Sequence, residues 1–143
     1  MATAFLPLID GFEETEAIAT IDILRRAGVD VTTVGIGKTT ATGSHQITVH
    51  TDAEYSVARK AAYDAIVLPG GPGVKELNKV EGLHGYVRTQ IEENRLVAAI
   101  CAAPSILASA GLLEGVKCSC FPSVEDFVKE KGGDVVHEEV VRT

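Results

Sequence analysis

Three things are scarce in this sequence of 143 residues, and each excludes a class of protein. No apolar run approaches the roughly 20 residues that a membrane-spanning helix needs. Basic residues number 13 against 20 acidic ones, without any basic run, so the chain does not look like a binder of nucleic acid or of an anionic membrane. Cysteines number only three, and residues 1–9 lack the basic start and small-residue exit of a signal peptide. We therefore expect reduced thiols and a cytoplasmic protein.

With 45% hydrophobic residues, the composition is that of an ordinary globular protein. From the length we expect a single domain over residues 1–143. The predicted strands cover 3–9, 29–36, 63–68, 96–100, 116–121 and 134–141, with a hairpin over 41–52. The predicted helices cover 14–27, 80–94, 104–110 and a segment that opens at 123 with a capping box. Strands that alternate with helices predict an α/β fold, with a mainly parallel sheet and helices on both faces.

The end of the chain is unusual for such a fold. It stops at Thr143 directly after a predicted strand, with no helix to cover that strand. Two interpretations stay open: the chain is a fragment, or the last elements of the sheet come from elsewhere.

Ligands of parallel sheets bind outside the carboxyl ends of the strands, and three loops are expected there. They are residues 10–16, 69–73 and 100–104. Cys101, in the third loop, lies where a strand turns abruptly into a helix, as in a nucleophile elbow. The helix start favours a thiolate, the form that adds to carbonyls and is oxidised. A buried core cysteine is the alternative interpretation.

Glu16 is the second candidate, in the first turn of the helix that follows the first strand. Glu13 and Glu14 fit a solvated role that complements the helix dipole. Glu16 lies one turn before Ala19 and can point at the top of the sheet. If it meets Cys101, we expect it to hold a proton and donate it to the thiolate in a hydrogen bond, because two close anions are costly.

Gly70 and Gly71 supply backbone N–H groups that a ligand can approach closely, and with the N–H of Ala102 they suit an oxyanion hole. A simple sharp turn is the alternative. No Gly-Lys-Ser/Thr follows this loop and no G-x-G-x-x-G opens a helix, so a phosphate-binding loop and a dinucleotide cofactor are excluded.

The other thiols and the imidazoles give weaker signals. Cys118 and Cys120 face one side of a predicted strand, but no second pair completes a metal site, so core cysteines are favoured and no metal is expected. A disulfide between Cys101 and Cys120 is a further hypothesis. The four histidines lie in separate segments without metal-binding spacing, and we interpret them as surface or hairpin residues. They are His45, His50, His84 and His137.

Four segments together resemble one family. They are residues 11–16 (GFEETE), 25–28 (RRAG), 68–71 (LPGG) and 98–105 (AAICAAPS). In order and spacing they are similar to the ThiJ/PfpI superfamily, in the branch of the Parkinson-disease protein deglycase and its bacterial relatives. The resemblance implies a flavodoxin-like α/β sandwich that is usually a homodimer.

The resemblance also implies roles for the residues singled out above. Cys101 matches the family's reactive, oxidation-prone cysteine, and Glu16 matches the buried acid that hydrogen-bonds it. Gly70, Gly71 and Ala102 match the backbone donors around it. The implied function is a cysteine-dependent glyoxalase or deglycase for small 2-oxoaldehydes or their protein adducts, without metal or organic cofactor. The alternative is a redox sensor or chaperone whose cysteine is oxidised to a sulfinate.

The chain departs from the family in two respects. Many members have a His before a Pro in a strand-end segment, where this chain has Phe121, and the peptidase-like branch has a His at the position of Ala102. No His-assisted triad can be carried over, so peptidase activity is not expected. The family also continues with a strand, a Gly-Pro-Gly-type turn and a helix. Without them the fold is incomplete or is completed by another chain.

Overall fold

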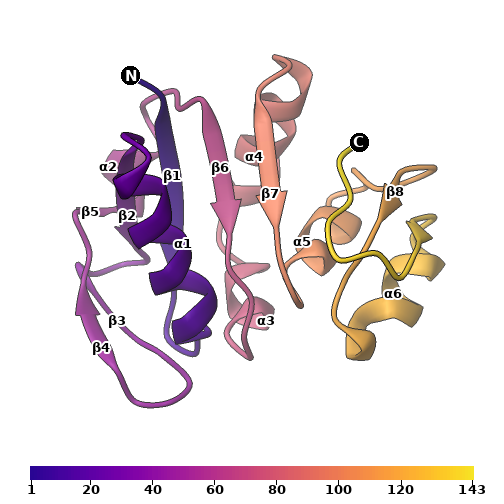
Figure 1. The fold of residues 1–143 in the computed structure, drawn as a ribbon, viewed down its shortest axis with the longest axis horizontal. Coiled ribbons are helices and arrows are strands. Elements are labelled where there is room, and N and C mark those ends of the chain that lie inside the picture. Colours follow the sequence, from indigo (N-terminus) through magenta and orange to yellow (C-terminus); the bar gives the residue numbers. More distant parts are fainter.

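A parallel five-stranded sheet forms the centre of the protein, and the computed structural model describes all of residues 1–143 (Figure 1). From edge to edge its strands are β5 (Ala53–Glu54), β2 (Asp30–Gly35), β1 (Thr3–Leu8), β6 (Ala65–Leu68) and β7 (Leu96–Ala99). Beside it, β3 (Thr40–Thr42) and β4 (Thr48–His50) form the antiparallel hairpin that was predicted over 41–52. The central position of β1 places the loop that follows it in the middle of the sheet's carboxyl edge.

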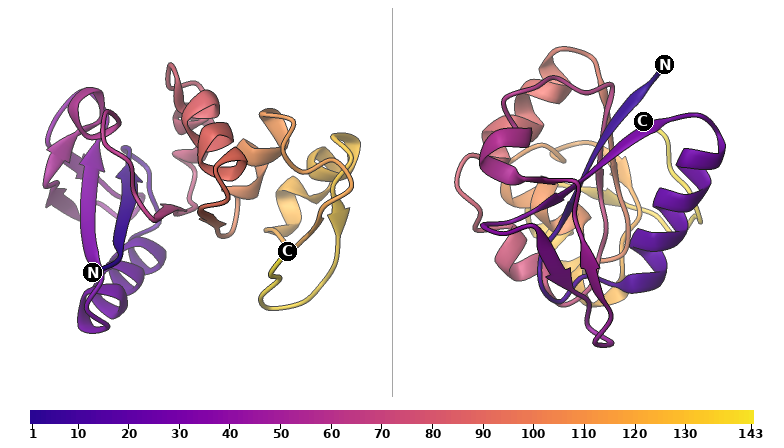
Figure 2. Two further views of the ribbon diagram at one scale, coloured as in Figure 1. Left: turned by 90° about the horizontal axis from the view of Figure 1, so that it is seen from above. Right: turned by 90° about the vertical axis from the view of Figure 1, so that its left-hand side faces the viewer.

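Helices cover both faces of this sheet. The helices of the chain are α1 (Glu14–Arg26), α2 (Tyr55–Ala58), α3 (Val74–Leu77), α4 (Leu83–Glu92), α5 (Pro104–Ser109) and α6 (Glu125–Glu130), with a 3-10 turn at Pro122–Val124. Of these, α6 packs against α5 and β9 and not against the five-stranded sheet. Figure 2 shows α1 on one side of the sheet and α2 and α4 on the other. None of these helices combines the length and the hydrophobicity that crossing a membrane requires. The predicted α/β sandwich with a flavodoxin-like arrangement is confirmed.

The alternation of β1 side chains divides the core between the two faces. Ala4, Leu6 and Leu8 enter the cluster under α1, where Ala17 packs against them. Phe5 points to the other face, where its ring lies among three tyrosine rings at centroid distances of 5.1 to 6.4 Å. Burial on both faces explains why this strand is a continuous apolar run.

The last third of the chain departs from the prediction. Only β8 (Lys117–Cys118) forms within the strand predicted at 116–121, and only β9 (Asp134–Val135) within that predicted at 134–141. The two pair with each other in parallel, in a separate two-stranded sheet. Beyond these residues no further strand pairs with either segment, and an extended segment without a partner strand does not form a strand of its own.

β7 was predicted to be a buried strand, and the structure shows it at an edge. It pairs with β6 on one side and has no strand on the other. Leu96 at its start is 58% exposed, and Ile100 just after it is 48% exposed. The exposed edge faces a groove of about 890 Å³ between β7 and the C-terminal segments.

Two helix starts also differ from the prediction. The capping box at 123 is wrong, because Pro122 opens a 3-10 turn that takes in Ser123, and α6 begins after Val124 without a side-chain cap. The helix predicted from residue 80 begins at Leu83, because Gly82 has a φ of 80° outside the helical region. The short elements α2, α3 and β5 are missing from the prediction, since segments of two to four residues carry no periodicity.

Candidate active site

The three loops expected at the carboxyl edge of the sheet do meet there, because β1, β6 and β7 are neighbours. The loop after β1 and the loop after β6 are joined by two backbone hydrogen bonds. Gly73 N–H donates to Gly11 C=O over 2.9 Å, and Glu13 N–H donates to Gly70 C=O over 3.0 Å. The loop after β6 is thereby held against the start of α1, which carries Glu16.

Gly70 connects the acid to this framework. Its N–H donates to Oε1 of Glu16 over 2.9 Å. The N–H of Glu16 itself donates to the Glu13 carboxylate over 2.8 Å, which caps α1. Hydrogen bonds therefore fix both the backbone N–H and the carboxylate of Glu16. The carboxylate has a defined orientation and does not move freely in solvent.

Gly70 also shows that the acid and the cysteine are adjacent. A Cβ atom built on Gly70 would lie 2.6 Å from Cβ of Cys101 and 2.6 Å from Oε1 of Glu16. The side chains of these two residues, 85 positions apart in the chain, thus approach a single point. No residue other than glycine fits between them.

Cys101 occupies a strained backbone position. Its φ is 61°, in the left-handed region that non-glycine residues rarely adopt. Such a conformation costs about 1–3 kcal/mol and persists only where the surrounding structure imposes it. Here the carbonyls on either side are engaged: Ile100 C=O accepts from Ala103 N–H, and Cys101 C=O accepts from Phe121 N–H over 2.7 Å. The predicted elbow between strand and helix is confirmed.

The surroundings of the thiol act on its ionisation in two directions. Burial raises the pKa of Cys101, and the nearby Glu16 raises it further through its charge and a hydrogen bond. The N–H groups of Ala102 and Gly71 lie within hydrogen-bonding reach of the sulfur and lower the pKa, but by less. The expectation that the helix start yields a thiolate is therefore corrected: the net pKa shift is upward, and the thiol needs a base.

The predicted backbone donors divide into two roles. The backbone N–H groups of Gly71 and Ala102 each lower the pKa of the Cys101 thiol. The N–H of Gly70, which was predicted to be a third donor to the ligand, is already bound to Glu16. Gly70 positions the acid, and two donors remain beside the thiol.

Glu14 was predicted to be a solvated acid, and this is wrong. Its side chain is buried, with 7% of the residue exposed, and it accepts hydrogen bonds from the N–H groups of His45 (2.8 Å) and Ile47 (3.3 Å) in the β3–β4 hairpin. Glu14 lies one turn before Ala17 and two before Ile21, which are both buried. The helical periodicity of the sequence therefore already indicates that Glu14 lies on the buried face of this helix. The same register leaves Ala19 exposed, so the expectation that Ala19 belongs to the apolar face is wrong.

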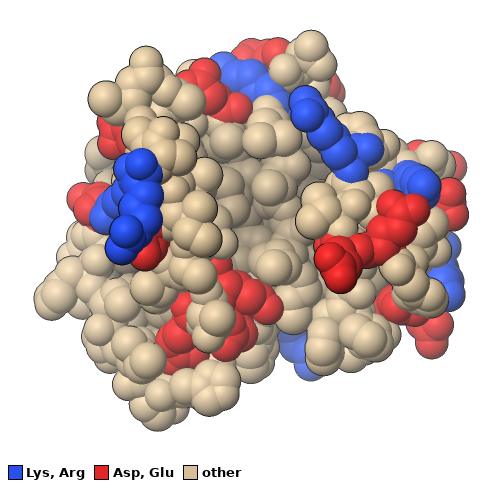
Figure 3. All heavy atoms as spheres, in the orientation of Figure 1, with Lys and Arg blue, Asp and Glu red and all other residues tan.

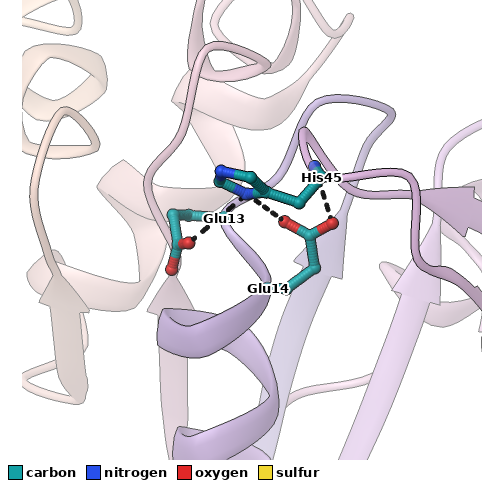
Figure 4. A group of neighbouring side chains, drawn as sticks. All are labelled: Glu13, Glu14 and His45. Carbon is teal, nitrogen blue, oxygen red and sulfur yellow. Dashed lines mark hydrogen bonds and ion pairs between the residues drawn. The ribbon is translucent and has the colours of Figure 1, made fainter.

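Figure 4 shows how His45 completes this contact. Its Nδ1 lies 3.1 Å from Oε1 of Glu14 and 3.9 Å from Oε1 of Glu13. The ligand atoms of these three residues lie within 4.8 Å of one another, close enough to surround a cation. Their oxygens, however, already accept N–H groups of the protein, so the cluster works as a latch between α1 and the hairpin.

The Glu14 latch predicts an acid-sensitive contribution to stability. Burial by itself raises the pKa of Glu14, but the hydrogen bonds that its carboxylate accepts outweigh this effect and lower the pKa from 4.5 to about 2. A carboxyl group whose pKa is depressed by folding stabilises the protein above its unfolded pKa, and this stabilisation is lost as the pH falls toward the folded value. We expect Glu14→Gln to lower the Tm near neutral pH, with the gap to wild type closing between about pH 4.5 and 2.

Thermal unfolding followed by circular dichroism over this pH range measures the gap. Glu92→Gln, an exposed acid on α4, is the matched control and should leave the Tm unchanged. A gap between wild type and Glu14→Gln that stays constant down to the lowest pH would contradict the role of the ionised carboxylate.

Cys118, Cys120 and His137 line the same groove as Cys101, along the edge of β7. Cys118 is buried, Cys120 is half-buried, and all three cysteines are free thiols. His84 pairs with Asn78 over 2.7 Å and His137 with Glu125 over 3.0 Å. No histidine belongs to the loops at residues 10–16, 69–73 and 100–104.

The sequence is similar to proteins of known families. The model of the DJ-1/PfpI family matches residues 2–143. The chain belongs to the DJ-1/PfpI family. A deglycase from Thermococcus kodakarensis is 34% identical over 134 residues, which cover 92% of this chain and 80% of that protein. Protein DJ-1 homolog A from Arabidopsis thaliana is 39% identical over 123 residues, and the match spans about a third (31%) of its length.

Solved DJ-1 structures share the fold closely. A DJ-1 superfamily protein from Salmonella typhimurium, solved as a cysteine-to-alanine variant, is 33% identical with a TM-score of 0.93. DJ-1beta from Drosophila melanogaster is 30% identical, also with a TM-score of 0.93. The alignments cover 100% and 99% of this chain, and 78% and 77% of those two chains.

Proposed function

We propose that this DJ-1/PfpI protein is a cysteine-dependent glyoxalase or deglycase that acts on 2-oxoaldehydes or their protein adducts. The observation that carries the proposal is the convergence of Cys101 and Glu16 on the point occupied by Gly70. Relatives support it by their names: the Thermococcus protein is a deglycase, and a Caenorhabditis elegans protein 29% identical to this chain is a glutathione-independent glyoxalase.

The geometry favours a reaction in which Glu16 first acts as a base. The raised pKa of Cys101 keeps its proton on sulfur, so the carboxylate takes this proton as the sulfur adds to the aldehyde carbon. The proton passes to the aldehyde oxygen, which gives a hemithioacetal. Glu16 then removes the proton on the former aldehyde carbon, which gives an enediol. A proton shifts between the two enediol oxygens, and Glu16 returns its proton to the neighbouring carbon.

The remaining steps need only water. The rearranged product is a thioester of Cys101, and hydrolysis releases a 2-hydroxy acid and restores the thiol. The N–H groups of Gly71 and Ala102, which flank the sulfur, would hold the oxygen on the carbon bonded to it. One molecule of water is added overall and one hydrogen moves between carbons, so the reaction needs no oxidant or reductant.

A second function is favoured by the same two donors. If hydrogen peroxide oxidises Cys101, each of two peroxide molecules transfers one oxygen to sulfur and leaves as water, and the product is a sulfinate. The N–H groups of Gly71 and Ala102 and a protonated Glu16 would bind its oxygens. A solved DJ-1 from Toxoplasma gondii, 29% identical to this chain, is in an oxidised form. In this alternative the protein senses oxidants and does not turn over aldehydes.

One preparation of the purified protein separates the two functions. We expect methylglyoxal, without glutathione, to be converted to lactate at a rate proportional to the protein concentration, measured with lactate dehydrogenase. Absence of lactate above the buffer control would overturn the glyoxalase proposal. In that case a gain of two oxygen atoms on Cys101 after mild peroxide, located by peptide mass spectrometry, would favour the sensor, and an unmodified Cys101 would remove it as well.

A further inference from the structure

Gly70 replaces one of the two hydrogen bonds that would close a capping box at the start of α1. In a capping box, the residue just before the helix and the acid three positions later each accept from the N–H of the other. Glu13 and Glu16 hold these positions, and Glu13 Oε2 accepts from Glu16 N–H over 2.8 Å. The N–H of Glu13, however, donates to Gly70 C=O over 3.0 Å. The Glu16 carboxylate is therefore not bound to the helix end.

Three hydrogen bonds instead form a closed ring that begins and ends at Glu16. The Glu16 carboxylate accepts from Gly70 N–H over 2.9 Å, Gly70 C=O accepts from Glu13 N–H, and the Glu13 carboxylate accepts from Glu16 N–H. A network in which every member is bonded holds its groups rigidly. The Glu13 carboxylate is the one side chain in this ring besides that of Glu16, so its removal opens the ring and leaves both backbones in place.

The backbone of Glu13 also borders a donor that acts on the thiol. A Cβ atom built on Gly71, which has a φ of 105°, would lie 2.6 Å from the backbone nitrogen of Glu13. The N–H of Gly71 is one of the two that lower the pKa of Cys101. The residue that caps α1 thus contacts the loop that orients the acid and supplies this donor.

The cap of α1 is an uncommon one, in a region rich in negative charge. Helix caps are most often Ser, Thr, Asp or Asn. The only hydrogen bond of the Glu13 carboxylate is the one to Glu16 N–H, since its other oxygen lies 3.9 Å from Nδ1 of His45. Figure 3 shows acidic side chains gathered where α1 begins, and Glu14 and Glu16 belong to its first turn. Like charges repel, so a carboxylate that is not held here is expected to turn toward solvent.

We propose that Glu13 is a positioning residue, whose carboxylate fixes the backbone of Glu16 so that the Glu16 carboxylate faces Cys101. It acts through Glu16 and takes no part in proton transfer. The proposal rests on the proposed function, in which Glu16 is the base, and it deepens that function by assigning the group that orients this base. Without the Glu13 carboxylate, the N–H of Glu16 loses its partner, and we expect the Glu16 carboxylate to turn toward the free N–H groups at the start of α1.

Steady-state kinetics with methylglyoxal test this role. We expect Glu13→Ala to lower kcat about tenfold with little change in KM, because the base is misplaced while the substrate still binds. Glu13→Gln keeps an oxygen acceptor at the same distance and should retain most of the activity. Glu14→Gln is the matched control, because the Glu14 carboxylate lies in the same turn but binds the β3–β4 hairpin. Well below its Tm, this control should keep the kcat of wild type.

Equal losses of kcat in Glu13→Ala and Glu14→Gln would overturn the proposal, because they would indicate a general weakening of the start of α1. An unchanged kcat in Glu13→Ala would overturn it as well. If Glu13→Ala does not fold, Glu13→Gly takes its place, since glycine suits a cap position better than alanine and also lacks the carboxylate.

The pKa of Cys101 tests the positioning of Glu16 without turnover. The pH dependence of alkylation by iodoacetamide, with the label located at Cys101 by peptide mapping, measures this pKa. Glu16 raises the pKa of Cys101 through its charge and a hydrogen bond, so we expect Glu16→Gln to lower it. Glu13→Ala should lower this pKa in the same direction and to a smaller extent, whereas Glu13→Gln and Glu14→Gln should keep the value of wild type.

This measurement separates the inference from the proposed function. If wild type forms no lactate, a lower pKa of Cys101 in Glu13→Ala but not in Glu13→Gln still supports the positioning of Glu16 by Glu13. A pKa that Glu13→Ala leaves unchanged, or that Glu13→Gln lowers equally, overturns the inference even if the protein is a glyoxalase.

Discussion

Cys101→Ser is expected to lower kcat/KM for methylglyoxal by about a thousandfold or more, the scale on which enzymes lose activity when the nucleophile is removed. Serine keeps the size and the hydrogen bonds of the position, so the fold and the strained φ of 61° should persist. Its hydroxyl group loses a proton far less readily than a thiol, and a carboxylate such as Glu16 cannot remove it efficiently. Lactate formation at methylglyoxal concentrations well below KM, with circular dichroism to confirm the fold, measures the effect.

The other two cysteines provide the controls for this substitution. Burial raises the pKa of Cys118 and of Cys120, and neither lies beside an oriented acid and a pair of N–H donors. Cys118→Ser and Cys120→Ser should therefore retain the activity of wild type to within about threefold. If Cys101→Ser retains wild-type activity, or if Cys120→Ser loses it, the nucleophile has been misassigned.

Gly70→Ala is expected to produce the second-largest effect, a loss of about a hundredfold in kcat/KM together with a destabilisation of about 1–3 kcal/mol. The added methyl group would lie 2.6 Å from Cβ of Cys101, 2.6 Å from Oε1 of Glu16 and 3.0 Å from the carbonyl oxygen of Ile100. Two of these three atoms belong to Cys101 and Glu16, the pair proposed to react, so relief of the overlap is expected to separate the acid from the thiol. Activity and thermal unfolding measured on the same samples show whether the two losses occur together.

Gly85→Ala is the matched control for this experiment. Gly85 lies within α4 and an added Cβ there meets nothing within 4 Å. Alanine is favoured over glycine inside a helix by about 0.5–1 kcal/mol, so this variant should be slightly more stable and fully active. Wild-type kinetics in Gly70→Ala would contradict the close approach of Cys101 and Glu16 around this glycine.

The fold could be predicted where the pattern was long and its environment uniform. β1 is buried on both faces by two separate clusters, so its apolar run predicts a strand even though Pro7 cannot donate a hydrogen bond to the sheet. The helix predicted over 14–27 forms as α1 over Glu14–Arg26. Of the strand predicted at 134–141, only two residues form a strand in the structure. Strand formation depends on an adjacent strand to pair with as well as on composition. A single sequence does not determine which strand pairs with this segment.

The candidate site was predictable in its parts and not in its connections. The elbow at Cys101 followed from the change from strand to helix. Glu16 was distinguished from the neighbouring acids by its place one turn before Ala19, although the structure leaves Ala19 exposed. The bond from Gly70 N–H to Glu16 was missed, since a glycine in a loop carries no sign of which carboxylate it will meet. Glu14 was misread because its place in the first turn outweighed its place on the buried face of the helix.

The bond that orients Glu16 comes from a residue 54 positions later in the chain, and the latch on Glu14 from one 31 positions later. No local segment can therefore assemble the acid and the sulfur. A nascent or unfolded chain carries an isolated cysteine with no base at its side, and only completion of the sheet joins the two. Folding itself is therefore the step that pairs the thiol with the acid, and a chain that has not reached its native state lacks this pair.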